Sequence, residues 1–289
     1  MTSQNNRPLR SVLYIPGSKP RALEKARQLP VDAIIFDLED AVAPDEKATA
    51  RDTLATAFAE GGYGARLKIV RINGLETRWG PDDARAVAAI GADAVLMPKV
   101  DGPEDLDALK RITGDLPLWS MMETAQGILA ADRIAAHPSS AGMVMGTNDL
   151  AKEMGTRHRA DRLPLMPGLG LCVLAAKAHG IAIVDGVFNA FKDDEGLEAE
   201  CAQGRDMGFD GKTLIHPAQV AIANAAFSPT AAEVDLAVRQ IAAFQAALDA
   251  GQAVAVVDGR IVENLHVATA RETLAKRDAI AALAAEGSP

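Results

Sequence analysis

Eight short apolar runs rich in β-branched residues recur along the chain, and each is followed by a polar or amphipathic stretch of helical character. Parallel strands need such crossover segments between them, so alternation of this kind favours a parallel sheet. Eight units are the number of a closed barrel, and the pattern predicts an α/β fold, a (β/α)₈ TIM barrel. The runs are SVLYIPG at 11–17, AIIFDLED at 33–40, KIVRIN at 68–73, AVLMPKV at 94–100, LWSMMET at 118–124, GMVMGTND at 142–149, IAIVDGVF at 181–188 and GKTLIHP at 211–217.

An open, doubly wound sheet is the alternative fold. It more often has a glycine-rich turn after its first strand, and the GxGxxG motif is absent from this chain. Gly168-Leu169-Gly170 lacks both the third glycine and a preceding strand. The barrel is therefore the favoured prediction.

The alternation of apolar runs with helical stretches ends after Pro217. Two helical stretches, 231–250 and 265–283, flank a hairpin-like piece in which Asp258-Gly259 is a plausible tight turn. We expect a barrel over residues 1–217 and a C-terminal helical lid extension over 218–289.

Bulk composition agrees with this fold and excludes several functions. Hydrophobic residues make up 48% and aromatic residues 4%, which favours a core of Ala, Val, Ile and Leu between strands and helices. A net charge of −9 argues against broad binding to nucleic acid or to an anionic membrane. Two cysteines without a CxxC motif, and no apolar run of membrane-spanning length, indicate a cytoplasmic protein.

Polar residues collect at the ends of the predicted strands, where barrel enzymes carry their chemistry. A cap or a surface role is the ordinary explanation for any one of them, but their coincidence at corresponding positions favours a site. They are Asp37, Glu39, Asp40, Arg71, Asn73, Lys99, Glu123, Asn148, Asp149, Asp185 and His216.

Carboxylates dominate this set, so a metal ion held there would be hard and oxygen-ligated, Mg²⁺ or Mn²⁺ rather than zinc. Glu123 and Asp149 are the simplest pair of ligands. Mg²⁺ usually takes one or two protein carboxylates and leaves other positions to water and substrate. The alternative for Asp149 is an N-cap of the following helix.

Arg71 offers a permanent planar donor that could neutralise charge developing on a thioester carbonyl. An ion pair with Glu39 or Asp40 is the structural alternative, and the two roles are compatible. Lys99 raises the possibility of a Schiff-base aldolase. A serine hydrolase is disfavoured because GxSxG is absent.

The chain resembles the citrate lyase β-subunit-like family, within the HpcH/HpaI aldolase superfamily, which acts on coenzyme A thioesters. The resemblance covers essentially the whole chain and implies the same barrel. Seven motifs carry it in the family's order, namely RSVLYIPGSKPRALEKA, IIFDLEDAVAPDEK, VRINGLET, LMPKV, METAQG, MGTNDLA and GKTLIHPAQV.

The resemblance also implies roles for individual residues. Glu123 and Asp149 would bind Mg²⁺, with Mn²⁺ possible, and Arg71 would contact the substrate carbonyl beside the acidic pair Glu39 and Asp40. Substrate and coenzyme A binding would fall to Tyr14, Lys19, Lys25, Asn148, Ile215 and His216.

Family members of this kind form trimers or dimers of trimers, in which the C-terminal segment reaches across a neighbouring barrel. The base carried by that segment corresponds to Glu263, where many lyases of the family have Asp. Two segments, VFNAFKDDEGLEAECAQGRDMGFDGKTLIHPAQ and VAVVDGRIVENLHVATARETLAK, resemble the (3S)-malyl-CoA thioesterase branch. Hydrolysis of malyl-CoA is the expected activity, with cleavage to glyoxylate and an acyl-CoA, or a non-catalytic barrel that binds CoA esters, as alternatives.

Overall fold

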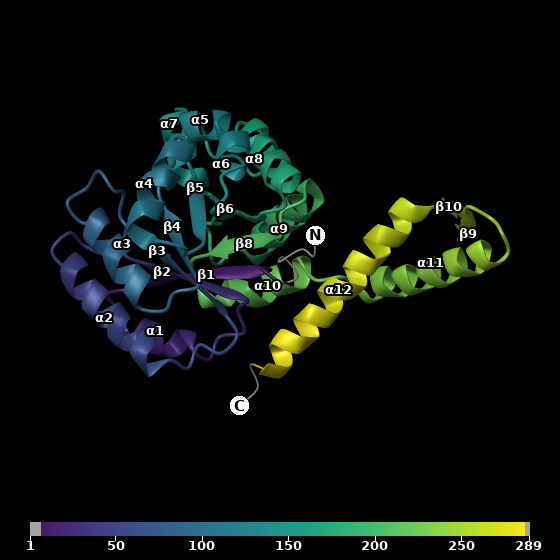
Figure 1. The fold of residues 1–289 in the computed structure, drawn as a ribbon, viewed down its shortest axis with the longest axis horizontal. Helices are drawn as coiled ribbons and strands as arrows, with labels where there is room; N and C mark the ends of the chain where they lie inside the picture. The colour runs from purple at the N-terminus through teal and green to yellow at the C-terminus, as the bar shows by residue number, and fades with distance from the viewer. Residues whose placement is uncertain (1–6, 287–289) are drawn as a thin grey trace. The chain divides into compact units, whose positions relative to one another are not determined.

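The computed structural model describes residues 7–286 and divides the chain into two compact units. One contains residues 9–227, and the other contains residues 228–286 with the short described stretch before the barrel. Figure 1 shows the barrel unit in purple to green and the C-terminal helices in green to yellow.

Eight parallel strands close into a barrel in sequence order, and the predicted fold is confirmed. Closure comes from β1, which pairs in parallel with β2 on one side and β8 on the other. Each observed strand lies within or next to a predicted run. The strands are β1 (Ser11–Pro16), β2 (Ala33–Asp37), β3 (Leu67–Arg71), β4 (Ala94–Met97), β5 (Leu118–Met122), β6 (Ser140–Met145), β7 (Ala182–Asp185) and β8 (Gly211–Leu214).

Helices follow the strands and cover the barrel's outer face (Figure 1). Local sequence explains their starts: Pro20 and Pro103 occupy the first turns of α1 and α4, where a missing N–H costs no hydrogen bond. The helices of this unit are α1 (Pro20–Ala26), α2 (Lys47–Glu60), α3 (Gly80–Ala89), α4 (Pro103–Thr113), α5 (Ala125–Leu129), α6 (Ala131–Ala135), α7 (Thr147–Glu153), α8 (Met166–His179), α9 (Asp194–Met207), the 3₁₀ turn η1 (Pro217–Gln219) and α10 (Val220–Ala226).

Side chains alternate along each strand between two hydrophobic cores. One core fills the barrel interior and includes Val12, Ile35 and Val144. The other lies between the strands and the helices and includes Leu13, Ile34 and other aliphatic side chains. A polar side chain at a strand end therefore reaches the barrel mouth only if it has the inward parity.

The C-terminal unit contains α11 (Ala231–Asp249), the antiparallel pair β9 (Ala255–Val257) and β10 (Arg260–Val262), and α12 (Asn264–Glu286). Asp258 and Gly259 join the two strands with φ of 50° and 73°, as a tight hairpin turn requires.

The barrel unit ends at Phe227, past the expected limit of 217, because α10 packs on β1 and α9. No described helix has both the length and the apolarity of a membrane span.

Candidate functional site

A cavity of about 330 Å³ lies at the carboxyl ends of the strands. Inward-facing residues of β1, β2, β3 and β5 contribute to it, together with the loops after β5, β6, β7 and β8. Barrel enzymes carry their active sites at this end. Its polar or charged lining residues are Tyr14, Asp37, Asp40, Arg71, Glu123, Thr147, Asn148, Asp149 and Asn189.

Arg71 is held mainly by Asp37, a strand-end candidate that the sequence analysis did not expect as its partner. Its Nε and Nη2 donate to the two carboxylate oxygens at 2.8 and 2.6 Å. Asp37 and Arg71 are the last residues of neighbouring strands and lie opposite each other in the parallel register. Register could have indicated this contact, because both residues share the inward parity of their strands.

The remaining nitrogen of Arg71 serves the predicted acidic pair. Nη1 lies 2.7 Å from Glu39 and 3.8 Å from Asp40. The guanidinium also stacks over the ring of Tyr14, 5.0 Å from its centroid. Burial acts to lower the pKa of Arg71, but Asp37, Tyr14 and Glu39 raise it well above the ordinary value, so the cation is permanent.

Hydrogen bonds with buried side chains hold the loop that carries Glu39. Asp37 accepts the backbone N–H of Glu39 at 2.9 Å, and the buried Lys47 donates to the carbonyls of Leu38 and Glu39 at 3.1 and 2.8 Å. Asn73, one of the strand-end candidates, also donates to the Leu38 carbonyl. Asn73 therefore positions this loop and does not line the cavity.

Glu39 and Asp40 differ in their surroundings. Glu39 is buried, and burial raises the pKa of its carboxyl to about 7 even though Arg71 acts in the opposite direction. Asp40 is exposed. The carboxyl of Glu39, which titrates near neutrality, is therefore suited to proton transfer.

Glu123 and Asp149 both line the cavity and follow the neighbouring strands β5 and β6. Glu123 is 3% exposed, and burial raises the pKa of its carboxyl to about 7, with the Asp149 charge adding to the effect. Its Oε1 accepts the backbone N–H of Lys99 at 2.8 Å. Asp149 lies in the first turn of α7, and the N-cap is Gly146, so the alternative that Asp149 caps the helix is wrong.

Gly146 makes room for this carboxylate and was missed from the sequence. A Cβ at Gly146 would lie 2.4 Å from Glu123 Cβ and 2.6 Å from Glu123 Oε2. Oε2 accepts no hydrogen bond from any described residue. Such a close approach of backbone to side chain is a common reason for glycine.

The donor set fits a hard divalent ion that keeps several waters. Within residues 7–286, no group of three or more His, Cys, Asp and Glu side chains could hold a metal ion by itself. Two facing carboxylates, one of them buried with a free oxygen, are the usual protein share of a Mg²⁺ site. Zinc, which prefers His and Cys ligands, does not fit.

The residues expected to bind coenzyme A divide into two groups. Tyr14, Asn148 and Ile215 line the cavity, and burial raises the pKa of the Tyr14 hydroxyl above its ordinary value, which keeps it neutral. Lys19, Lys25 and His216 are exposed outside this lining. Lys19 pairs with Glu46 at 3.3 Å, and His216 stacks on Phe191 with ring centroids 4.6 Å apart.

Glu263 belongs to the C-terminal unit, between β10 and α12. Its side chain is exposed, and its backbone N–H donates to the imidazole Nδ1 of His266 at 3.1 Å. This bond orders the helix start and leaves the carboxylate available.

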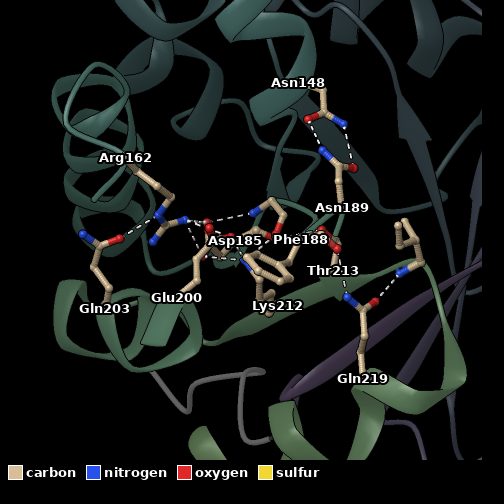
Figure 2. A network of polar contacts seen from close by, with 12 residues as sticks. Asn148, Arg162, Asp185, Phe188, Asn189, Glu200, Gln203, Lys212, Thr213 and Gln219 are labelled. Atoms are coloured by element: carbon tan, nitrogen blue, oxygen red, sulfur yellow. Dashed lines mark hydrogen bonds and ion pairs between the residues drawn. The ribbon is translucent and has the colours of Figure 1, made fainter. Parts of the chain in front are cut away.

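Lys99 and Asp185, two further strand-end candidates, also lie outside the cavity lining. Lys99 is exposed with a left-handed φ of 50°, and an imine-forming lysine would need desolvation. Asp185 is fully buried in the layer between strands and helices, because it shares the outward parity of Ile183. Figure 2 shows Asp185 in an ion network with Arg162, Glu200 and Lys212.

Comparison with known proteins places these residues in a family context. Residues 10–217 match the family described as HpcH/HpaI aldolase/citrate lyase. A (3S)-malyl-CoA thioesterase of Cereibacter sphaeroides is 67% identical over 278 residues, which are 96% of this chain and 98% of the relative. An L-malyl-CoA/beta-methylmalyl-CoA lyase of the same species is 35% identical and covers 96% of both chains.

A solved structure has the same architecture over most of the chain. It is the protein CitE from Mycobacterium tuberculosis in complex with magnesium, acetoacetate and coenzyme A. Sequence identity is 27%, the TM-score is 0.80, and the alignment covers 94% of this chain and 99% of the other.

Proposed function

Because the chain belongs to the HpcH/HpaI aldolase/citrate lyase family, we propose that it is a Mg²⁺-dependent (3S)-malyl-CoA thioesterase that releases malate and free coenzyme A. The observation that carries the proposal is the 67% identity, over nearly the full length of both chains, to a thioesterase of that name. The carboxylates of Glu123 and Asp149 and the guanidinium of Arg71, which line the cavity, are groups that this reaction needs.

Substrate binding follows from the lining of the cavity. Tyr14, Ile215 and Asn148 would contact the acyl and pantetheine portions, since all three line the cavity. Lys19, Lys25 and the backbone at His216 would hold the phosphate-bearing end, because they are exposed outside the cavity.

Glu123 and Asp149 would hold the metal ion, and the crystal structure of the Mycobacterium relative contains magnesium. A bound Mg²⁺, or Mn²⁺, would supply a Lewis acid for the 2-hydroxycarboxylate end of malyl-CoA. The buried Glu123 must lose its proton for that role, which its pKa of about 7 permits at neutral pH.

Hydrolysis requires a base for water and a donor for the oxyanion. Glu263, from a neighbouring subunit, would take a proton from water, and the resulting hydroxide adds to the thioester carbonyl. Arg71 stabilises the negative oxygen by charge and hydrogen bonds. The C–S bond then breaks as the carbonyl re-forms, the thiolate leaves with its electron pair, and the proton that Glu263 took from water would convert it to the free thiol of coenzyme A.

The proposal is tested by incubating the purified protein with (3S)-malyl-CoA and Mg²⁺ while free thiol and glyoxylate are followed together. Hydrolysis gives thiol without glyoxylate, and EDTA abolishes it until Mg²⁺ is restored. Equal glyoxylate and acetyl-CoA without free thiol would contradict the thioesterase proposal.

Cleavage of the C–C bond is the second candidate, favoured by the 35% identity to a malyl-CoA lyase. In that reaction a base takes the hydroxyl proton, and Arg71 stabilises the thioester enolate that forms. Glu263→Asp shortens the base by one methylene, and the ratio of thiol to glyoxylate in this variant separates the two reactions. An unchanged ratio would show that the length of residue 263 does not select between them.

A further inference from the structure

A second cavity of about 280 Å³ adjoins the proposed active site, and we call it the arginine cavity. The two cavities share Thr147, Asn148, Val187 and Asn189 as lining residues. The amides of Asn148 and Asn189 donate to each other at 3.3 and 2.8 Å (Figure 2), and both residues line both cavities.

Basic side chains dominate the arginine cavity. It is lined by Arg157, His158, Arg159 and Arg162, and its one acidic lining residue is Glu200. This concentration is unusual in a chain of net charge −9. Clefts lined by one sign of charge attract small ligands of the opposite sign.

Most of the charged side chains that line this cavity already have an ion-pair partner of opposite charge. Arg159 pairs with Asp161 at 2.6 Å, and the Glu200 carboxylate lies 2.6 Å from the fully buried Lys212. Arg157 is exposed and has no partner among residues 7–286. The cavity therefore has an uncompensated positive charge.

Arg162 is the buried and firmly held residue of the arginine cavity. It is 4% exposed, its Nη1 donates to both oxygens of Asp185 at 2.8 Å, and its Nε donates to Gln203 at 2.7 Å (Figure 2). Its Nη2 is buried without a hydrogen-bond partner in the part of the chain that the structure describes. Buried donors in native proteins normally have partners, so this nitrogen has donor capacity left for a ligand or an ordered water.

The backbone conformation of Arg162 also indicates a ligand site. Arg162 has a left-handed φ of 53°, which is unfavourable for a residue with a long side chain. Its three hydrogen bonds to Asp185 and Gln203 hold it in this conformation. Strained residues held in this way cluster at ligand sites, and here the strain coincides with a basic cavity.

We propose that the arginine cavity binds a small organic acid through its carboxylate groups, separately from the thioester in the main cavity. Guanidinium groups present planar donors that match a carboxylate, and the Asn148 and Asn189 amides offer further donors where the two cavities share lining residues. The proposal is independent of which thioester the main site uses, because it concerns a free acid.

The test is calorimetric titration of metal-free, EDTA-treated protein with malate, succinate and inorganic phosphate. The variant is Arg157→Ala combined with His158→Ala, both exposed, so the fold is retained. The matched control is Arg111→Ala, which removes from α4 an exposed arginine that lies outside the cavity and has no ion pair with any described residue. Removal of the metal separates this binding from metal-dependent binding in the main cavity.

We expect both dicarboxylates to bind the wild type, the double variant to weaken them at least about tenfold, and Arg111→Ala to change little. No binding to the wild type, or equal binding to the double variant, would overturn the proposal. Phosphate binding tighter than either acid would overturn the carboxylate assignment. Failure of thioester hydrolysis would leave these binding results unaffected, so the two proposals fail separately.

Discussion

Arg71 grips both carboxylate oxygens of Asp37, with Nε–Oδ1 and Nη2–Oδ2 distances of 2.8 and 2.6 Å, at the ends of adjacent strands. This pair of hydrogen bonds leaves only Nη1 of Arg71 for Glu39 and fixes the plane of the guanidinium. The orientation of the proposed oxyanion donor therefore depends on a residue that need not contact the reacting carbonyl.

Asp37→Asn should lower both stability and turnover. Removing one charge of a buried pair commonly costs about 3–5 kcal/mol, and a loosened Arg71 should reduce kcat more than it changes KM. Urea denaturation and steady-state kinetics with malyl-CoA measure the two effects. Asp32→Asn is the matched control, since Asp32 holds Arg10 in a similar two-oxygen pair at the opposite end of β2. It should lose stability but keep kcat.

Arg71→Lys should retain the charge but lose the planar fork. Loss of one oxyanion donor commonly reduces kcat by about 10²–10³, and lysine cannot replace two directed N–H groups on Asp37. Single-turnover rates with saturating malyl-CoA measure the chemical step directly. A rate close to that of the wild type would show that Arg71 does not stabilise the oxyanion.

Glu123→Gln and Asp149→Asn should each weaken Mg²⁺ binding at least about tenfold, because each removes a negative ligand. Calorimetric titration with Mg²⁺ and the recovery of activity after EDTA treatment are the measurements. Glu153→Gln is the control, since Glu153 is an exposed carboxylate at the other end of α7. If all three variants bound Mg²⁺ equally, the metal site would lie elsewhere.

The metal-free protein should lose stability as pH rises from 5 to 8. Burial raises the pKa of Glu39 and Glu123 to about 7, above the value of about 4.3 in an unfolded chain. Between these values the folded state binds more protons than the unfolded state, so the free energy of unfolding decreases with pH. Each carboxyl should contribute about 1–3 kcal/mol to that decrease.

Urea midpoints at several pH values check this slope. Glu123→Gln should reduce it, and Mg²⁺ should reverse part of it by binding the deprotonated carboxylate. Exposed Glu104 provides the control, because Glu104→Gln should leave the slope as in the wild type. Stability that rises with pH in the metal-free protein would refute the proposed burial effect.

Gly146→Ala should impair Mg²⁺ binding while the barrel still folds. The new methyl group would overlap Glu123, whose carboxylate must then leave its present position. Gly170→Ala is the control on the same unit, because a Cβ there meets nothing within 4 Å. Equal Mg²⁺ affinity in both variants would show that Glu123 tolerates the displacement.

Much of the fold could be predicted because strand formation leaves a local pattern. The eight apolar runs each contain or adjoin one observed strand, and Asp258-Gly259 forms the expected turn. The seven family motifs also indicated a family that the match over residues 10–217 confirms. Where runs extended too far, as at Thr147–Asp149, the excess residues form the loop or helix start that carries the site.

The sequence by itself determined the number of strands and which polar residues follow them, because both depend on neighbours along the chain. Only the tertiary structure decided that Arg71 meets Asp37, that Gly146 admits Glu123, and that Asp185 faces outward into a buried ion network. Those outcomes depend on strand register and barrel closure, which bring distant residues together and assign each side chain to one face of the sheet.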